Sequence, residues 1–276
     1  IIASAPSIED IDATPTGYLT TVLDNQGNQT ATLVASGSNR KYVTINEIPI
    51  NLQHAFVAIE DERFYDHNGI DLQGILRAGL KGVASGFHFS EGASTITQQL
   101  LKNTVFTQWT SEQSMADKFE RKFQEQYLAL QLEKVVDKDW ILENYLNAIN
   151  LGQNTLGVGV ASERYFGKDV SDLTLSECAV LAAITQSPSY YNPITHPDHN
   201  KERRQKVLNN MLDQGYISQS EYDEAVADNV YDRIQVVNVE SQDENINSYF
   251  VDEMTDQIVQ DMIDRLGYTE TQAYKA

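Results

Sequence analysis

The sequence predicts a mainly helical protein with one small β-hairpin near its start. Beyond residue 50, apolar residues recur at helical spacing, as at Met115, Phe119 and Phe123. Capping-box patterns such as Thr174 with Glu177 mark helix starts. β-branched residues on both sides of a turn sequence at 25–28 predict a hairpin of residues 18–23 with 30–35.

The predicted helices follow one another along the chain. The first carries Leu52, Phe56 and Ile59 on one face and leads directly into Glu60. Ser94 is a candidate N-cap for a second helix that runs to about residue 103. The remaining helices are predicted at 115–134, 138–150, 174–184, 200–213, 218–228 and 250–262, with a strand at 234–239 and an acidic linker up to residue 247.

Composition excludes some classes of protein. With 276 residues and 41% hydrophobic content, the chain can bury a substantial core. A formal charge of −20 argues against nucleic acid as a partner, because a phosphate backbone requires a basic surface. The single cysteine, Cys178, excludes an internal disulfide and is interpreted as a small buried hydrophobe. No apolar run approaches the roughly 18 residues that a membrane span requires.

Glu60 is the first candidate for chemistry. It lies where an apolar helix gives way to a charged turn closed by Gly69, a position suited to a general base. The alternative is an ordinary helix-end carboxylate that pairs with Arg63. His67 in the same turn is either an acid/base or a structural hydrogen-bonding residue. The second interpretation is favoured because no further His or Cys stands at metal-ligand spacing.

A second polar group opens the next predicted helix. Residues 94–99 place hydroxyls, amides and free backbone N–H groups together, which predicts an oxyanion or phosphate site. Lys102 adds positive charge further along this helix. Simple N-capping by Ser94 or Thr95 is the alternative, although it explains one residue and not the paired glutamines.

The third group, Arg121, Lys122 and Glu125, lies on one predicted helix. A surface salt bridge at i,i+4 spacing is the ordinary explanation for Arg121 with Glu125. Leu128 and Leu132 share that side, so the helix is expected to contact protein on both sides and its charges to line a cleft. Two carboxylates with several cations suit glycosyl transfer from a diphosphate donor.

These residues belong to a pattern that resembles the peptidoglycan glycosyltransferase domain of class A penicillin-binding proteins, found also in monofunctional cell-wall glycosyltransferases. The resemblance runs from about Pro15 to Gly215, with five motifs in the family's order. They are 60–69 with Glu60 and His67, 92–103 with Ser94 and Gln99, 121–133 with Glu125, 141–167 with Asn147 and Gly157, and 175–193 with Glu177 and Asn192.

The resemblance implies a lysozyme-like helical fold of two lobes around a membrane-facing cleft. The implied reaction polymerises lipid II into β-1,4 glycan strands with inversion and release of undecaprenyl diphosphate. It implies residence at the extracytoplasmic face of a bacterial cell membrane and sensitivity to moenomycin-type inhibitors. It further implies a glycosyltransferase domain at 48–235, after an N-terminal extension at 1–47. The segment 236–276 would connect to a C-terminal transpeptidase domain, so the chain is expected to be a fragment.

The resemblance also assigns roles residue by residue. Glu60 matches the catalytic base. Glu125 matches a second carboxylate that positions substrate, in the family through a divalent cation such as Mg²⁺ or Mn²⁺. The matched substrate-binding residues are Arg63, Ser94, Thr95, Gln98, Gln99, Lys102, Arg121, Lys122 and Asn147. Departures from the pattern are Ala93 in place of a frequent Gly, a long 104–119 segment and a variant loop at 150–154.

Two rival functions are considered. A lysozyme-like hydrolase of finished cell wall would also use a carboxylate in a helical cleft, but it would not need Lys102, Arg121 and Lys122, since its leaving group is a sugar. A non-catalytic membrane scaffold would not need both Glu60 and Glu125.

The glycine-rich, aromatic segment 82–89 predicts a loop with exposed rings that docks reversibly to lipid, and the alternative is a buried loop. The chain's negative charge repels anionic bilayers, so binding must come from apolar insertion of Phe87 and Phe89. Liposome co-sedimentation is expected to persist at high salt and to fall in a Phe87→Ser, Phe89→Ser double variant. Equal sedimentation of variant and parent would remove this segment from the lipid-facing surface.

Overall fold

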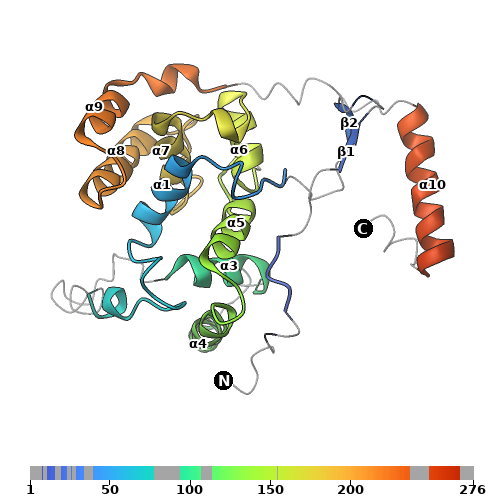
Figure 1. Cartoon of the computed structure of the whole chain (residues 1–276), viewed down its shortest axis with the longest axis horizontal. Helices are drawn as coiled ribbons and strands as arrows, with labels where there is room; N and C mark the ends of the chain where they lie inside the picture. Colours follow the sequence, from blue (N-terminus) through green and yellow to red (C-terminus); the bar gives the residue numbers. More distant parts are fainter. Residues whose placement is uncertain are drawn as a thin grey trace. The chain divides into compact units, whose positions relative to one another are not determined.

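The structure is a computed structural model that describes residues 8, 11–15, 20–23, 26, 29–33, 40–77, 94–106, 114–153, 155–236 and 249–267 (Figure 1). The chain divides into two compact units, Ile1–Pro15 with Tyr42–Gln235 and Thr16–Lys41 with Val236–Ala276. The predicted division into an N-terminal extension, a glycosyltransferase domain and a connector stays a prediction.

The first unit is helical, which confirms the predicted mainly α class. Its helices are α1 (Ile50–Glu60), α3 (Ile96–Thr104), α4 (Met115–Leu132), α5 (Lys138–Ala148), α6 (Val158–Phe166), α7 (Leu175–Ile184), α8 (Pro197–Asp213) and α9 (Gln219–Ala227). Two short 3₁₀ helices, Val170–Asp172 and Val230–Arg233, join them. Residues 72–77 are also helical.

Helix α7 forms the centre of one packed group. Residues 176–184 are all buried, and from Cys178 to Ile184 the helix is apolar around its whole circumference. It packs against α1, α8 and α9. Cys178 lies here, fully buried, and burial raises the pKa of its thiol, as expected for a small hydrophobe. Each fully buried Leu or Ile contributes about 1.5–3 kcal/mol relative to an exposed one.

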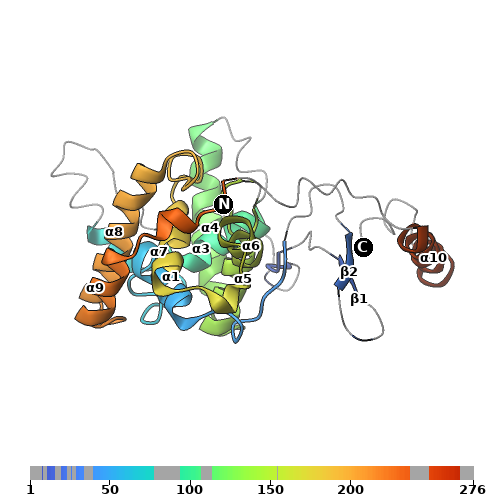
Figure 2. The ribbon, with the colours of Figure 1, turned by 90° about the horizontal axis from the view of Figure 1, so that it is seen from above.

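A second group consists of α3 packed against α4 and α5 (Figure 2). Leu100 and Leu101 of α3, Leu128 of α4 and Leu142 of α5 are fully buried. Glu60 stands at the last position of α1, and its side chain bonds to α3 of the second group. The carboxylate therefore lies where the two groups of helices meet.

The turn after α1 is held by Asp61. Both carboxylate oxygens of Asp61 lie 3.0 Å from His67 Nε2, and Oδ2 accepts from the backbone N–H of Ile96 at 2.9 Å. The backbone N–H of Gly69 donates to Nδ1 of His67 at 3.2 Å. The favoured interpretation of His67 as a structural residue is confirmed by these contacts.

Several predicted boundaries change. Thr95, and not Ser94, is the N-cap of α3, where its hydroxyl and the Gln98 side chain form a capping box. Ser94 instead accepts from Lys122. The predicted capping box at Thr174 is confirmed, and Ser218 forms a second one with Glu221 at the start of α9. Helix α8 begins earlier than predicted because Pro197 is well suited to a first helical turn.

The predicted strand at 234–239 is wrong over its described residues. The segment leaves the 3₁₀ helix at Arg233, and residues 234–236 are not extended into a ladder. Instead the backbone N–H of Gln235 donates to the Tyr165 carbonyl at 2.9 Å. The rest of the predicted strand, the predicted acidic linker up to residue 247 and the predicted lipid-docking segment 82–89 lie outside the described residues.

In the second unit, strand β1 (Thr20–Leu23) pairs antiparallel with β2 (Gln29–Leu33). The register shifts between Val22 and Leu23, which marks a bulge before the turn. The predicted hairpin is therefore confirmed. Helix α10 (Tyr249–Leu266) confirms the predicted final helix. No helix among the described residues is both long and apolar enough to cross a bilayer.

The position of Gly69 leaves no room for a side chain. Its φ is +91°, and a Cβ here would stand 2.5 Å from the carbonyl oxygen of Ala129. Gly69→Ala is expected to lower the free energy of unfolding by about 2–4 kcal/mol, since it adds a steric clash to backbone strain. Urea denaturation measures the loss.

Gly215→Ala is the matched control for that prediction. Gly215 has a φ of +78° but nothing within 4 Å of the added Cβ, so only backbone strain of about 1 kcal/mol is expected. Equal losses for the two variants would contradict the close approach of the turn to α4.

Candidate active site

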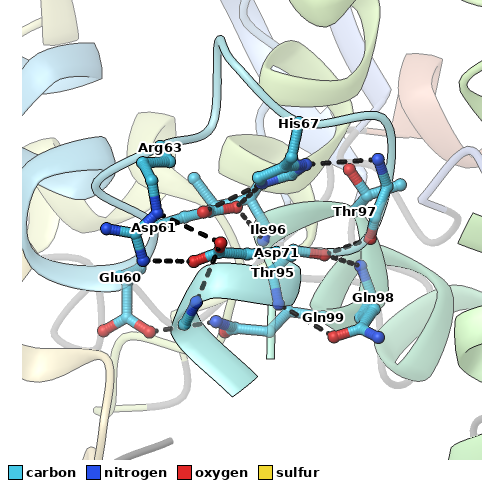
Figure 3. Close-up of polar contacts among 12 residues, drawn as sticks. Glu60, Asp61, Arg63, His67, Asp71, Thr95, Ile96, Thr97, Gln98 and Gln99 are labelled. Carbon is cyan, nitrogen blue, oxygen red and sulfur yellow. Dashed lines mark hydrogen bonds and ion pairs between the residues drawn. The ribbon is translucent and has the colours of Figure 1, made fainter. Parts of the chain in front are cut away.

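Three segments of the chain bring polar groups to the carboxylate of Glu60, whose side chain is 13% exposed and thus still reachable from solvent. Gln99 from α3 donates through Nε2 to Oε2 at 3.0 Å (Figure 3). The hydroxyl of Thr185, which follows α7, donates to Oε1. Arg203 from α8 places Nη2 3.4 Å from the same Oε1. The alternative pairing of Glu60 with Arg63 is not what the structure contains.

Arg203 itself is tightly held. Its Nη1 donates to the side-chain oxygen of Gln186, and its guanidinium lies 5.0 Å from the ring centroid of Tyr191. A stacked, hydrogen-bonded guanidinium has few accessible rotamers, so it presents its charge to Glu60 in a defined direction.

Sequence reasoning missed Arg203 and Thr185. A signal for Arg203 existed, because it shares a helical face with Val207 and Met211, and all three are buried. A charge on an otherwise apolar face requires a buried partner. Thr185 carries no such signal, since its role depends on the packing of α7 against α1.

Tyr145 supports this arrangement from α5. It is fully buried, and burial together with the nearby charges of Glu60 and Asp61 raises the pKa of its phenol well above the ordinary value. The neutral hydroxyl donates to the side-chain oxygen of Gln99 over a long 3.5 Å. This contact orients the Gln99 amide so that its nitrogen faces Glu60.

Glu125 is the centre of a second polar cluster. It is completely buried in α4, where Arg121 donates to Oε1 and Lys122 lies 3.0 Å from Oε2. A buried carboxylate requires such pairing to offset its lost hydration. Two cations share one anion, so the cluster carries a net charge of about +1. The ordinary surface salt bridge considered from sequence does not describe a buried pair.

Lys122 also joins the cluster to the segment before α3. Its Nζ donates to Ser94 Oγ at 2.6 Å as well as to Glu125. Ser94 and Gln99 lie at the two ends of one short segment. Gln99 bonds directly to Glu60, and Ser94 is connected to Glu125 through Lys122. Lys102 lies half-buried in the last turn of the same helix.

Other predicted substrate contacts have structural roles here. Thr95 and Gln98 are buried and bond to each other in the capping box, and Thr95 also donates to the Gly69 carbonyl at 2.8 Å. Asn147 is fully buried and holds residue 43 through both its backbone N–H and its carbonyl. Thr95 and Asn147 thus bond to the protein's own backbone, whereas Gln98 is engaged through its side-chain oxygen and its buried Nε2 has no hydrogen-bond partner.

Arg63 likewise supports the turn. Its Nε donates to Asp71 Oδ1 at 3.1 Å, and its Nη1 donates to Glu62 at 3.1 Å. The guanidinium beside it holds the pKa of Asp71 below the ordinary value, against the opposing effect of burial. Arg63 thus links the first motif turn to residues 72–77, which begin after Asp71.

The predicted oxyanion site at the start of α3 is partly filled by the protein itself. The first amide of the helix, from Ile96, donates to Asp61, as Figure 3 shows. An internal carboxylate therefore uses the helix dipole that a phosphate would need. The cations of the Glu125 cluster, Arg121 and Lys122, are further positively charged groups described near this segment.

The donor set around Glu125 does not fit a resident Mg²⁺ or Mn²⁺. Both of its oxygens already accept from cations, whereas such ions take several oxygen ligands free of competing positive charge. Within the described residues, no group of three or more His, Cys, Asp or Glu side chains gathers around one point.

Comparison with known proteins identifies the family. The family model described as Transglycosylase matches residues 26–212, more than half of the chain. Penicillin-binding protein 1A of Clostridium perfringens is 39% identical over 100% of this chain and 40% of that protein. Penicillin-binding protein 1F of Bacillus subtilis is 48% identical over 72% of this chain and 27% of that protein.

A crystal structure of penicillin-binding protein 1A from Haemophilus influenzae matches 92% of this chain and 25% of that chain, with a TM-score of 0.44 and 24% identity. The family match and the sequence relatives establish that the chain belongs to the transglycosylase family, the peptidoglycan glycosyltransferase domain of class A penicillin-binding proteins. The chain spans well under half of the length of these sequence relatives.

Asn147→Ala tests the structural role of that residue. It leaves the backbone N–H and carbonyl of Val43 without their partner, so the free energy of unfolding is expected to fall by about 1–3 kcal/mol. Thermal melting measures the loss. The kcat/KM of the folded variant is expected to stay near the parent value.

Asn150→Ala is the matched control, because Asn150 is exposed and water can replace its bond to the N–H of Gly152. An unchanged stability of Asn147→Ala with a raised KM would return Asn147 to the substrate-binding set.

Proposed function

We propose that this domain polymerises lipid II into β-1,4 glycan strands, inverting the anomeric centre and releasing undecaprenyl diphosphate. The observation that carries the proposal is the segment from Ser94 to Gln99. Through Gln99 it contacts Glu60, and through Ser94 and Lys122 it connects to Glu125. One short stretch of chain thus links a candidate base to a cationic cluster suited to a diphosphate.

Glu60 is the general base in this proposal. As the 4-hydroxyl of the acceptor sugar loses its proton to Glu60, the hydroxyl oxygen attacks the donor's anomeric carbon. The bond from that carbon to the diphosphate oxygen breaks, and its electron pair leaves with the diphosphate. Attack on the face opposite the leaving group inverts the anomeric centre. A positioned base of this kind contributes about 10²–10⁴-fold to a rate.

The cations stabilise the departing diphosphate. Charge develops on its oxygens as the bond breaks, and preorganised donors act most strongly on such developing charge. Arg121 supplies a fork-shaped set of donors and Lys122 a compact charge, both oriented by Glu125. Glu125 is therefore a residue that holds the two cations in place.

The cations also separate this proposal from hydrolysis of finished cell wall. A hydrolase releases a sugar through one of its hydroxyl groups and has no use for the net positive cluster at Glu125. Product analysis distinguishes the two: polymer growth from lipid II supports the transferase, whereas shortening of mature glycan supports the hydrolase.

The wider setting is part of the proposal. The sequence relatives bear the name penicillin-binding protein and are much longer than this chain, which supports a C-terminal transpeptidase domain in the complete protein. A lipid-linked substrate supports action at the extracytoplasmic face of a bacterial membrane. The growing glycan strand is then the second substrate.

Glu60→Gln is expected to lower polymerisation of lipid II by about 10²–10⁴-fold, because the amide cannot take the proton. Glu224→Gln, an exposed carboxylate on α9, is the control and should retain parental activity. Continuous turnover assays give both values. Near-normal turnover of Glu60→Gln would show that another group is the base.

Arg121→Ala is expected to weaken a moenomycin-type inhibitor, whose binding would use the diphosphate-recognition groups. Losing one charge-assisted contact costs about 1.5–3 kcal/mol, or roughly 10- to 150-fold in affinity. Isothermal titration calorimetry measures it, with Lys138→Ala as a control cation that pairs with Glu133. Unchanged affinity for Arg121→Ala would place the diphosphate site elsewhere.

A further inference from the structure

The two oxygens of the Glu60 carboxylate are held unequally. Oε1 accepts from the Thr185 hydroxyl and lies 3.4 Å from Arg203 Nη2, whereas Oε2 accepts from Gln99. Each carboxylate oxygen offers two lone-pair sites. Oε1 therefore has both sites engaged, and among the contacts of the described residues Oε2 has one.

We propose that Glu60 takes the acceptor proton on Oε2, and that Thr185 is a positioning residue that reserves this oxygen by occupying Oε1 beside Arg203. The inference rests on the proposed function of Glu60 as base. It concerns which atom receives the proton and which side chain determines that choice.

The Thr185 hydroxyl has one proton and two acceptors within reach. Besides Glu60 Oε1, the Ala182 carbonyl lies 3.2 Å from its Oγ1. A hydrogen bond to an ionised carboxylate is about twice as strong as one to a neutral acceptor. The hydroxyl thus donates to Glu60 while the carboxylate is charged and turns to Ala182 once Glu60 has gained its proton.

This exchange keeps the buried polar groups satisfied on both sides of the proton transfer. Once the hydroxyl has turned to the Ala182 carbonyl, Arg203 is the remaining donor to Oε1 among the contacts described, and the new proton stays on Oε2. The proton moves from the acceptor oxygen to Oε2, the acceptor oxygen bonds to the anomeric carbon, and the diphosphate leaves with the electron pair of the broken bond.

The groups that surround Glu60 limit what else could control its charge. The charged and titratable groups brought to it by the described elements are Arg203 from α8, Tyr145 from α5 and the adjoining Asp61, which is paired with His67. Gln99 from α3 and Thr185 are neutral donors. Thr185 is therefore a contact that can be removed without changing the formal charge of the site.

Thr185→Val removes the hydroxyl at nearly constant shape, and Thr185→Ser keeps it. Lipid II polymerisation by the chain is measured across pH for the parent and both variants. For Thr185→Val we expect kcat to fall about 10-fold with KM unchanged, because Oε1 is then no longer occupied and Oε2 is no longer reserved for the acceptor proton. The acidic limb of the pH profile should move up by about one pH unit, because the ionised carboxylate loses a donor. Thr185→Ser should follow the parent in both respects.

A Thr185→Val profile that coincides with the parent's would overturn the inference, as would a change in KM alone. Should Thr185→Val melt well below the parent, Thr185→Ala against Thr185→Ser supplies the same comparison. Failure of the proposed function gives a different result, since the parent itself would then not polymerise lipid II at any pH.

Discussion

The carboxylate of Asp61 is the contact on which the arrangement of the site depends. It joins the end of α1 to the start of α3, through the first amide of that helix, and it holds His67 in the turn between them. With α1 and α3 fixed in this way, Gln99 reaches Glu60 and Ser94 reaches Lys122. Asp61 is thus a structural residue, and the position of the neighbouring candidate base, Glu60, depends on it.

One group of side chains in this protein has a charge opposite in sign to the net charge of the whole chain. The whole chain carries −20, yet the cluster of Arg121, Lys122 and Glu125 is locally positive. Local field and net charge are separate quantities, and an anionic ligand would respond to the local field of this cluster. A strongly acidic exterior also disfavours non-specific association with nucleic acid or anionic surfaces.

The helices and the two carboxylates could be predicted from the sequence because their signals are local. Apolar spacing marks α4, and the pattern at Thr174 marks the start of α7. The candidate base and the cation cluster lie within motifs of a few residues. Arg203 and Thr185 could not be placed beside Glu60, because more than a hundred residues of chain separate each of them from it.

Thr95, Gln98 and Asn147 show a different limit of sequence reasoning. Hydroxyls and amides serve equally well as ligands for a substrate and as partners for the protein's own backbone. The pattern of residue types is the same in both cases. Burial separates them, and burial depends on how distant segments pack: Asn147 bonds to Val43, whose place is known only after folding.

The backbone contact at Gly69 has a consequence for how this site can vary. The turn approaches α4 at Ala129, one helical turn beyond Glu125, and no side chain from Gly69 intervenes. The spacing between the helix of one carboxylate and the turn beside the other is thus set by peptide groups. A spacing set by backbone atoms does not change when neighbouring side chains are exchanged, so the residues around the two carboxylates can vary while this backbone contact is kept.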